Sequence, residues 1–560
     1  MKTPYELGNG NQTTTWAECI AFYERLASEH PGVLRFETAG ETDIGEPLHV
    51  GVISADGVFD RQAIQAAGRT VFFLDNGIHP GEPEGIDATM MLVRDLCEDP
   101  QRLDALGSTV LVFVPIYNVD GALKRNDTSR VNQEGPEAFG FRGNARHLDL
   151  NRDFVKCDSR NARSFNQLFS AWDPDVFVDT HTSNGADYQH VMTLIATQPD
   201  KLGGPLGAFL RERMLPHLYE EMTARGFPMC PYINTRKEIP DDGIEDFLDT
   251  PRFSTGYAAL HHVIGFMPET HMLKPFGERL ASMRHLVEAA LAFTVAHGQE
   301  IRGLKAETRA ADRKRRTFPV QWRLDETRHR TFRLKGFEAR WEPSRLGTYQ
   351  RLRYDRSAPF EKAIAWFDRF VPAAEIGAPA AYVIPQAWRE VVERLRLNGV
   401  HVKTVAEAKT LEVEAYRVLR YHPRSHPFEG RHLHDELELA TERLRYEARA
   451  GDFLVPVDQD RARYVIETLE PIAHDSFFRW GFFDAVLHRK ERFSDYVFED
   501  VAEELLETEP GLRERFEAWK RENPALLDSS EHVLGFLYEN CRRYAEPEWM
   551  RVPVFRLPRA

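Results

Sequence analysis

Short apolar runs alternate with longer amphipathic stretches along residues 15–300. The apolar runs have the length of buried strands, and three examples are 71–74, 109–116 and 176–179. Between them, apolar residues recur at the spacing of a helix that buries one face, as in 206–225 and 277–296. Strands that alternate with helices are typical of layered α/β domains. The pattern therefore predicts that residues 1–300 form one α/β domain.

The pattern changes after residue 300. Residues 301–316 are densely charged, which indicates a linker or a solvated helix. From 317 to 470, short β-like runs dominate, with a strand–helix–strand insertion at 381–405, and we predict a β-rich accessory domain there. The last part, 471–560, contains amphipathic stretches and is predicted to be a helical segment.

Composition and charge limit the partners of this protein. The chain has 560 residues, of which 42% are hydrophobic and 28% are charged, as in ordinary globular domains. Its formal net charge of -15 argues against nucleic acid or an anionic membrane as a partner. There is no apolar run of transmembrane length and no signal peptide at the start. We expect a cytoplasmic protein, or a periplasmic or secreted one if a signal was trimmed, with free thiols on its five scattered cysteines.

The pattern His-x-x-Glu is common in this chain, which has 21 histidines, so the spacing alone carries little weight. It begins at His79, His217, His285, His297, His426 and His488. Most of these sites lie in or at the end of helical runs, where the pattern predicts a surface i, i+3 pair, and His426 lies in a loop broken by prolines. Only His79 follows a predicted strand and precedes a predicted helix. Ligands in α/β sheets gather beyond the carboxyl ends of strands, so we predict that His79 and Glu82 bind a metal ion.

A third ligand is needed for a catalytic zinc site, which uses three protein donors and keeps one position open. His181 ends another apolar strand, in the stretch Asp179-Thr180-His181. Taken alone, a strand-end histidine that is bonded to its own backbone is an equally good interpretation. Together with His79 and Glu82, the position favours a third ligand. The sequence thus predicts one Zn²⁺ ion per chain.

The run 141–154 is the most specific feature. Arg142 lies nine residues before Asn151, and Asn151 belongs to an Asp-x-Asn-Arg motif. With the His-x-x-Glu pattern and the distant histidine, this run resembles the zinc carboxypeptidases, the metallocarboxypeptidase or M14 family, in a bacterial-type member with a long C-terminal extension. The resemblance covers roughly residues 10–300. It implies an α/β/α sandwich with a mixed sheet, followed by the smaller β-rich domain and the helical segment.

The resemblance also implies a role for each residue of the motif. Arg142 resembles the arginine that stabilises the oxyanion, and Asp149 resembles the carboxylate that orients His79. Asn151 and Arg152 resemble the pair that grips the terminal carboxylate of the substrate. The planar guanidinium of an arginine suits this task, because it matches both oxygens of a carboxylate.

Two further residues complete the implied site. Glu269 follows the apolar run 263–267 and resembles the general base, which takes a proton from a zinc-bound water and passes it to the leaving amine. Tyr257 lies twelve residues before Glu269 and is a candidate for the tyrosine that caps the substrate. In the family that tyrosine normally lies farther ahead of the base. A core or loop tyrosine is therefore an equal interpretation of Tyr257.

These residues imply a zinc-dependent metallocarboxypeptidase that hydrolyses the C-terminal amide bond of peptides or peptide-like substrates with a free carboxylate. Two alternatives stay open. A zinc amidohydrolase or deacylase acting on small N-acyl amino acids shares the same core motifs, although the extra residues 301–560 favour peptides. An inactive binding protein on the peptidase fold would be expected to lack a ligand or the base. The sequence gives no side-chain preference and no oligomeric state.

One other cluster of metal-binding residue types lies outside these motifs. Its members are His422, His426, Glu429, His432, His434 and Asp435. The spacing matches no zinc template, and Pro423 and Pro427 favour an exposed irregular loop. We interpret the cluster as a loop and not as a second metal site.

Overall fold

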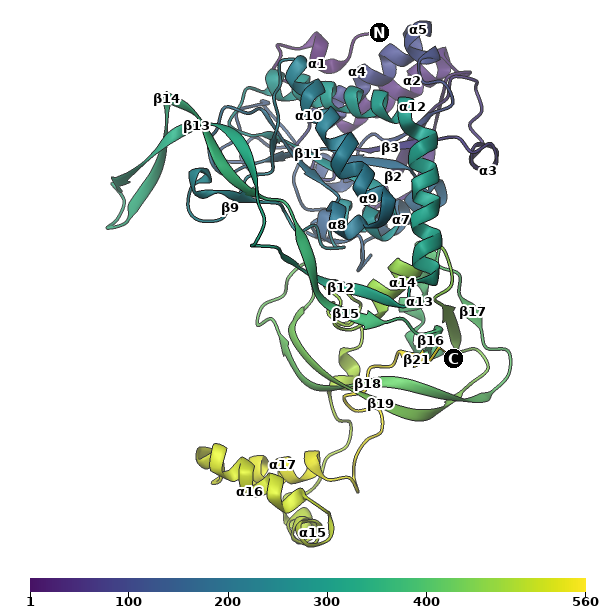
Figure 1. Ribbon diagram of the computed structural model, residues 1–560, viewed down its shortest axis with the longest axis vertical. Coiled ribbons are helices and arrows are strands. Elements are labelled where there is room, and N and C mark those ends of the chain that lie inside the picture. The colour runs from purple at the N-terminus through teal and green to yellow at the C-terminus, as the bar shows by residue number, and fades with distance from the viewer. Residues whose placement is uncertain (560) are drawn as a thin grey trace.

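A mixed β-sheet forms the centre of the N-terminal part of the protein in the computed structural model, which describes residues 1–559 (Figure 1). Its strands lie in the order β1-β2-β4-β3-β5-β11-β7-β8, and β6 pairs with β11. The strands are β1 (Leu34–Glu41), β2 (Pro47–Ile53), β3 (Val71–Asp75), β4 (Val110–Val114), β5 (Val176–Asp179), β6 (His181–Ser183), β7 (Met192–Ala196), β8 (Cys230–Pro231) and β11 (Ile264–His271). The central strands β4, β3, β5 and β11 run parallel, while β2 and β7 join them in antiparallel fashion.

Helices cover both faces of this sheet because its strands are apolar on both sides. Phe72 and Leu74 of β3 pack into one buried cluster, and Val71 and Phe73 pack into another on the opposite face. The first cluster includes side chains of α2 (Trp16–Glu29), α4 (Glu84–Glu98), α9 (Gly204–Phe209), α10 (Leu215–Ala224) and α12 (Phe276–Lys314). The second includes side chains of α7 (Arg160–Trp172) and α11 (Ser254–Leu260). Shorter helices are α1 (Pro4–Leu7), α3 (Arg61–Ala66), α5 (Pro100–Asp104), α6 (Val119–Ala122) and α8 (Pro199–Leu202).

The α/β architecture predicted from the periodicity is confirmed. The predicted strands at 71–74, 109–116 and 176–179 correspond to β3, β4 and β5. The predicted helix at 206–225 is present as α9 and α10, joined by a wide π-helical turn at Leu210–Met214.

Of the two interpretations of the charged segment 301–316, a linker or a solvated helix, the structure shows a helix, but it is not fully solvated. Helix α12 continues through it as far as Lys314, and one face is buried. Arg309 donates to both carboxylate oxygens of Asp173 at 2.7 and 2.6 Å, and Lys305 donates to the Asp173 carbonyl at 2.9 Å. These cations therefore attach the helix to the α/β domain. The run of charges could not show this, because the partner carboxylate lies far away in the sequence.

The accessory region contains a long hairpin, a separate pair of strands and a six-stranded sheet. A hairpin of β13 (Arg330–Pro343) and β14 (Gln350–Phe367) reaches up along the α/β domain, where β14 pairs with β10 (Ile244–Glu245), itself paired with β9 (Asn234–Thr235) (Figure 1). Strand β12 (Thr317–Leu324) pairs with β15 (Phe370–Gly377). The six-stranded sheet is formed by β16 (Ala381–Ile384), β17 (Lys403–Thr404), β18 (Lys409–Pro423), β19 (His434–Ala448), β20 (Phe453–Pro456) and β21 (Phe555–Leu557). Its helices are α13 (Arg389–Leu397) and α14 (Ala462–Leu469).

The predicted C-terminal helices are present, but they do not fill the whole of residues 471–560. Strand β21 pairs with β16 and β18, so the end of the chain returns to the accessory sheet. Phe477 and Trp480 are buried in the same cluster as Tyr257 of the α/β domain. Only α15 (Asp495–Thr508), α16 (Leu512–Glu522) and α17 (Ser530–Asn540) form a cluster of their own, drawn in yellow in Figure 1.

The cysteines and the helices can be compared with what the composition predicted. All five cysteines are buried, and within residues 1–559 all of them are free thiols. The same part of the chain contains no helix with the length and apolar character needed to cross a membrane.

Candidate functional site

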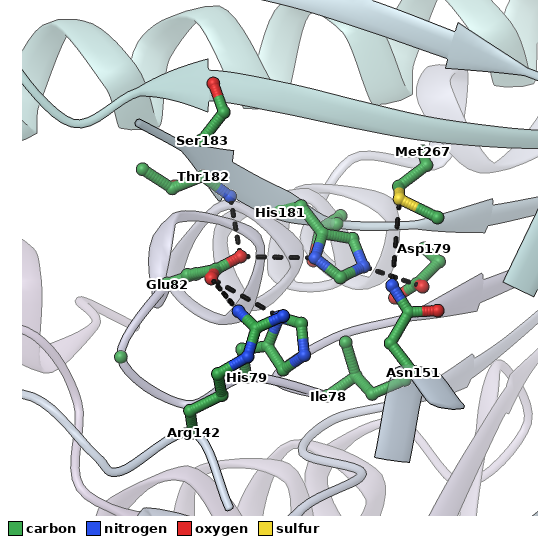
Figure 2. Close-up of polar contacts among 12 residues, drawn as sticks. Ile78, His79, Glu82, Arg142, Asn151, Asp179, His181, Thr182, Ser183 and Met267 are labelled. Carbon is green, nitrogen blue, oxygen red and sulfur yellow. Dashed lines mark hydrogen bonds and ion pairs between the residues drawn. The ribbon is translucent and has the colours of Figure 1, made fainter. Parts of the chain in front are cut away.

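Three predicted metal ligands meet at the carboxyl ends of the central strands. His79 and Glu82 lie in the turn between β3 and α4, and His181 begins β6 just after β5. Their ligand atoms all lie within 4.8 Å of one another. The Glu82 carboxylate lies between the two rings, with Oε1 3.3 Å from Nδ1 of His79 and Oε2 3.1 Å from Nδ1 of His181 (Figure 2). The structure thus brings together two imidazole nitrogens and one carboxylate.

Two aspartates orient the histidine rings. Nε2 of His79 lies 2.8 Å from Oδ1 of Asp149, and Nε2 of His181 lies 2.7 Å from Oδ2 of Asp179. Each Nδ1 consequently faces the shared centre. Within residues 1–559, the buried Nδ1 of His79 has no hydrogen-bond partner, which is unusual for a buried polar atom. Paired carboxylates behind histidine ligands are typical of zinc sites, so the residues present fit this metal.

Asp179 was not identified from the sequence, although a signal was present. Asp179 precedes His181 by two residues, and alternate residues of a strand lie on the same face. An aspartate at this spacing from a candidate ligand is therefore in position to reach its ring. Arg130, also missed, donates to Glu82 at 2.6 Å and to the Thr182 carbonyl at 2.7 Å. It lies in a loop with no motif that could reveal it.

The charges around Glu82 favour its ionised form. Burial alone would raise the pKa of this carboxyl group, but Arg130 and the two histidines outweigh burial and hold the pKa well below its usual range. In the same way, His79 and Arg142 overcome burial and hold the pKa of Asp149 well below its usual range. An ionised Glu82 is what a metal ligand requires.

Arg142 lies at the edge of this group. Its Nε and Nη2 lie 2.9 and 2.8 Å from Oδ2 of Asp149, and its Nη1 lies 3.3 Å from Oε1 of Glu82. The side chain is 45% exposed, so only part of it is fixed by these contacts. A permanent cation is therefore held beside the ligands with one side open to the solvent.

Asn151 and Arg152 lie in the short 3₁₀ turn Leu150–Arg152. The Asn151 side-chain oxygen accepts a hydrogen bond from the Ser254 amide at 3.0 Å, which fixes its amide group. The Arg152 guanidinium lies 4.4 Å from the centre of the Phe253 ring and donates to the Asn151 carbonyl at 2.8 Å. Stacking of this kind leaves the edge of the guanidinium able to bind an anion.

The three predicted metal ligands and the arginines beside them line one cavity of about 330 Å³. Its lining includes His79, Glu82, Arg130, Arg142, Asn151, Arg152, His181, Tyr232, Phe247, Phe253, Met267 and Glu269. Glu269 lies on β11, directly opposite His181 of β6 in the strand register. Burial, with Glu82 adding to it, raises the pKa of Glu269 to about 8. A buried carboxyl group that holds its proton more tightly than usual is suited to acid–base chemistry.

The prediction for Tyr257 needs correction. Its side chain is fully buried in α11, packs against Phe154 and Phe169, and donates to the Asn398 side chain at 2.6 Å. It does not line the cavity, and the alternative interpretation as a core tyrosine is the one observed. Tyr232 lines the cavity instead, from a loop that no sequence motif marks.

Arg252 lies next to Phe253 of the cavity lining, but its guanidinium is bound elsewhere. Its Nε and Nη2 lie 2.8 and 2.7 Å from Oδ1 of Asp475 in the C-terminal part. The arginine therefore joins the two parts of the chain and is not available as a free cation in the cavity.

A loop of the accessory region supports the Asp-x-Asn-Arg motif. Glu429, between β18 and β19, accepts a hydrogen bond from the Asp149 amide at 2.7 Å. Arg431 of the same loop donates to both carboxylate oxygens of Asp158 at 2.7 and 2.8 Å. Because Asp149 orients His79, the accessory loop contacts the metal group through one intermediate residue.

The histidine-rich cluster in and beside this loop does not converge on one point. His432 Nδ1 lies 2.8 Å from the Arg424 carbonyl, and His434 Nε2 lies 2.7 Å from Asp484. In the part of the chain that the structure describes, the only group of three donors close enough to share a metal ion is His79, Glu82 and His181.

Metal content provides the first prediction. The purified protein should hold about one zinc ion, and His181→Ala should lose it, because two donors are too few to fix the ion. Metal analysis and thermal unfolding measure the change, since a metal that binds only the folded state raises the unfolding temperature. His285→Ala is a matched control, because His285 lies 3.8 Å from Glu288 in a surface i, i+3 pair. Stoichiometric zinc in His181→Ala would exclude this ligand.

The accessory loop provides the second prediction. Glu429→Ala removes the acceptor of the Asp149 amide, so we expect zinc affinity and kcat to fall about tenfold, at the lower end of the effect of residues that support metal ligands. Glu429→Gln keeps an acceptor oxygen and should lie close to wild type. The exposed Glu436 of β19 provides the control variant, Glu436→Ala. Competition with a zinc chelator measures the affinity, and a wild-type value in Glu429→Ala would contradict the support role.

Comparison with known proteins shows which family part of this chain resembles. The profile of the family described as zinc carboxypeptidase matches residues 19–197. Carboxypeptidase 2 of Trichophyton tonsurans is 23% identical over 438 residues, and that of Trichophyton equinum is 23% identical over 433 residues; each match covers 73% of both chains. Among solved structures, the metallo-carboxypeptidase of Pseudomonas aeruginosa is similar at 18% identity and a TM-score of 0.36, covering 50% of this chain and 68% of that one. The metallo-carboxypeptidase of Burkholderia cenocepacia is similar at 16% identity and a TM-score of 0.38, and the match covers 51% of this chain and 70% of that one.

Proposed function

We propose that this chain, whose residues 19–197 match the family described as zinc carboxypeptidase, removes the C-terminal residue from peptides or peptide-like substrates by hydrolysis. One observation carries the proposal: a single cavity is lined by the three-donor group, by the buried Glu269 and by the Arg152 guanidinium. A carboxylate bound by Arg152 would lie beside the hydrolytic groups. Such a site would select the last amide bond of a chain.

Zinc fits the three donors in number and type. A zinc ion bound by His79, Glu82 and His181 would act as a Lewis acid toward the scissile carbonyl and would make water a better nucleophile at neutral pH. Asp149 and Asp179 would keep both rings in the tautomer that leaves Nδ1 free.

Glu269 is proposed to move the proton. As a carboxylate it would take a proton from the attacking water, and as an acid it would give that proton to the leaving amine. It lines the same cavity as the three donors and lies opposite His181, so one group would be in place for both steps. This single group would therefore serve as base and then as acid.

Arg142 is proposed to stabilise the negative charge that develops on the carbonyl oxygen. Arg130 also lies in the cavity, but its guanidinium already donates to Glu82 and to the Thr182 carbonyl. Arg142 is more exposed and has an open side. A fixed donor at such a position typically contributes about 3–4 kcal/mol to the transition state.

Arg142→Ala should therefore lower kcat far more than it raises KM, by roughly 10²- to 10³-fold, because the charge that it meets exists mainly in the transition state. Steady-state kinetics at saturating zinc measure both constants. Arg146→Ala is the control, because Arg146 is exposed in the same loop and donates to the Asp158 carbonyl. A raised KM with unchanged kcat would instead assign Arg142 to substrate binding.

The volume of the cavity is also compatible with a second function, the hydrolysis of small N-acyl amino acids. About 330 Å³ is at the small end for a ligand site and would also suit an N-acyl amino acid. A screen of the zinc-loaded protein separates the two functions. Peptides with free C-termini should be cleaved and their C-terminal amides should not, while a deacylase would cleave only N-acyl amino acids. Equal cleavage of free and amidated peptides would refute the carboxypeptidase proposal.

A further inference from the structure

A second cavity of about 310 Å³ adjoins the catalytic one. Ile195, Tyr232 and Phe247 line both cavities, so the two spaces are neighbours with these side chains at their border. The opposite wall of this side pocket belongs to the accessory hairpin, through Phe332 of β13 and Trp366 of β14. The accessory region therefore forms part of a space beside the catalytic groups.

The side pocket is lined mainly by apolar and aromatic side chains. Among its charged groups, Arg211, Arg330, Asp246 and Asp368 have partners, while Glu220 is exposed. Arg211 lies 2.8 Å from Asp200, and Arg330 lies 3.4 Å from Asp368. Asp246 accepts a hydrogen bond from the Trp366 indole nitrogen at 2.6 Å. An apolar group entering this pocket would thus leave few polar atoms without partners.

A row of aromatic rings leads from Arg152 to the side pocket. The Arg152 guanidinium lies 4.4 Å from the Phe253 ring centre, which lies 4.8 Å from that of Phe247. The Phe247 ring centre lies 6.1 Å from that of Tyr232, at the border of the two cavities. A residue whose carboxylate binds Arg152 therefore has an apolar surface beside it that continues to the pocket.

We propose that the side pocket receives the side chain of the substrate's C-terminal residue and selects large apolar, above all aromatic, side chains. This inference rests on the proposed carboxypeptidase function, because Arg152 must hold the terminal carboxylate for the side chain to reach the pocket. Its volume is at the small end for a ligand site and is sufficient for one large side chain. The accessory hairpin thereby becomes a determinant of specificity.

A basic side chain is the alternative, because Asp246, Asp368 and Glu220 line the pocket. Several features oppose it. The charge of Asp368 is balanced by Arg330, and Glu220 is exposed, so solvent screens its charge. Asp246 already binds the Trp366 indole, and burial raises its pKa to about 7, which weakens its negative charge. In addition, a cationic side chain would meet the guanidinium groups of Arg211 and Arg330, which also line the pocket.

Binding to the zinc-loaded Glu269→Gln variant tests the pocket without requiring hydrolysis. The probes are N-acetylated tripeptides that differ only in their last residue, which is phenylalanine, alanine or arginine. Titration calorimetry should show the phenylalanine peptide binding roughly tenfold to a hundredfold more tightly than the alanine peptide, as expected for burial of an aromatic side chain. Equal affinity, or tightest binding of the arginine peptide, would overturn the proposal.

Two variants link this preference to the pocket. Ala196→Phe fills it from β7, and Phe332→Ala opens its wall on the accessory hairpin, so each should reduce the ratio of the two affinities. Arg333→Ala is the control, since Arg333 is an exposed neighbour on β13 that pairs with Glu361 at 2.6 Å. An unchanged ratio in both pocket variants would contradict the assignment. Failure of the proposed function is a separate result, in which the wild-type enzyme binds the phenylalanine peptide and does not cleave it.

Discussion

Glu269→Gln is expected to keep the fold and the zinc ion and to lose about 10²- to 10⁴-fold in kcat, the range that a general acid–base group contributes. An amide of almost the same shape can fill the position, but it cannot accept a proton from water. Glu269 lies on the buried strand β11 opposite His181, so its backbone position does not depend on its charge. The loss should therefore arise from the missing proton transfer and not from unfolding.

Three measurements decide this prediction. Metal analysis and thermal unfolding should match wild type, while kcat falls. Glu278→Gln, an exposed position on α12, controls for the substitution itself. If Glu269→Gln turned over within a few-fold of wild type, the group that moves the proton would lie elsewhere in the cavity.

Local sequence patterns predicted that three metal-binding side chains meet at one edge of the sheet. Short apolar runs mark β3 and the strand before His181. The first run is followed by a turn that contains glycine and proline, and the second by polar residues, so each signal lies within a few positions of the ligands. Because parallel strands end at the same edge of a sheet, residues at their ends meet without further information. His79, Glu82 and His181 meet for this reason.

The contacts that the sequence did not reveal are between residues far apart in the chain. Asp149 and Glu429 are separated by 280 positions, and no local pattern connects an accessory loop with the motif that it supports. Arg309 of α12 is a second example, because its partner Asp173 lies far away in the sequence and no local pattern connects the two. Charge runs predict solvent exposure only when no opposite charge folds against them.

Tyr257 shows the limit of reasoning from spacing. The family resemblance made it a candidate substrate contact, although it lies closer to Glu269 along the chain than the family's tyrosine does. In the structure α11 turns the ring into the core, where Asn398 of the accessory region binds its hydroxyl. A helix presents only some of its residues to any one cavity. The residue type and its spacing were known from the sequence, whereas the face of α11 that is buried depends on what packs against it.

Arg152→Ala is expected to reduce the discrimination between free and amidated C-termini. In the wild-type protein, a terminal carboxylate would receive charge-assisted hydrogen bonds from the guanidinium, each contributing about 1.5–3 kcal/mol. An amidated end would lose these bonds and leave the guanidinium without its anion. We therefore expect kcat/KM for the free peptide to exceed that for the amide by at least about 100-fold in the wild type, from two such bonds, and by far less in the variant.

The surroundings of Arg152 make this test specific. Its ring partner Phe253 and its contact with the Asn151 carbonyl at 2.8 Å fix the side chain without using a carboxylate, apart from a distant approach of 3.9 Å to Asp149. Asp149 also keeps its contacts with Arg142, so zinc content should be retained in Arg152→Ala. Arg152→Lys keeps the charge and loses the planar fork, and it should give intermediate discrimination. If Arg152→Ala preserved the full preference for free C-termini, another group would bind the carboxylate, and the assignment of Arg152 as the clamp would be wrong.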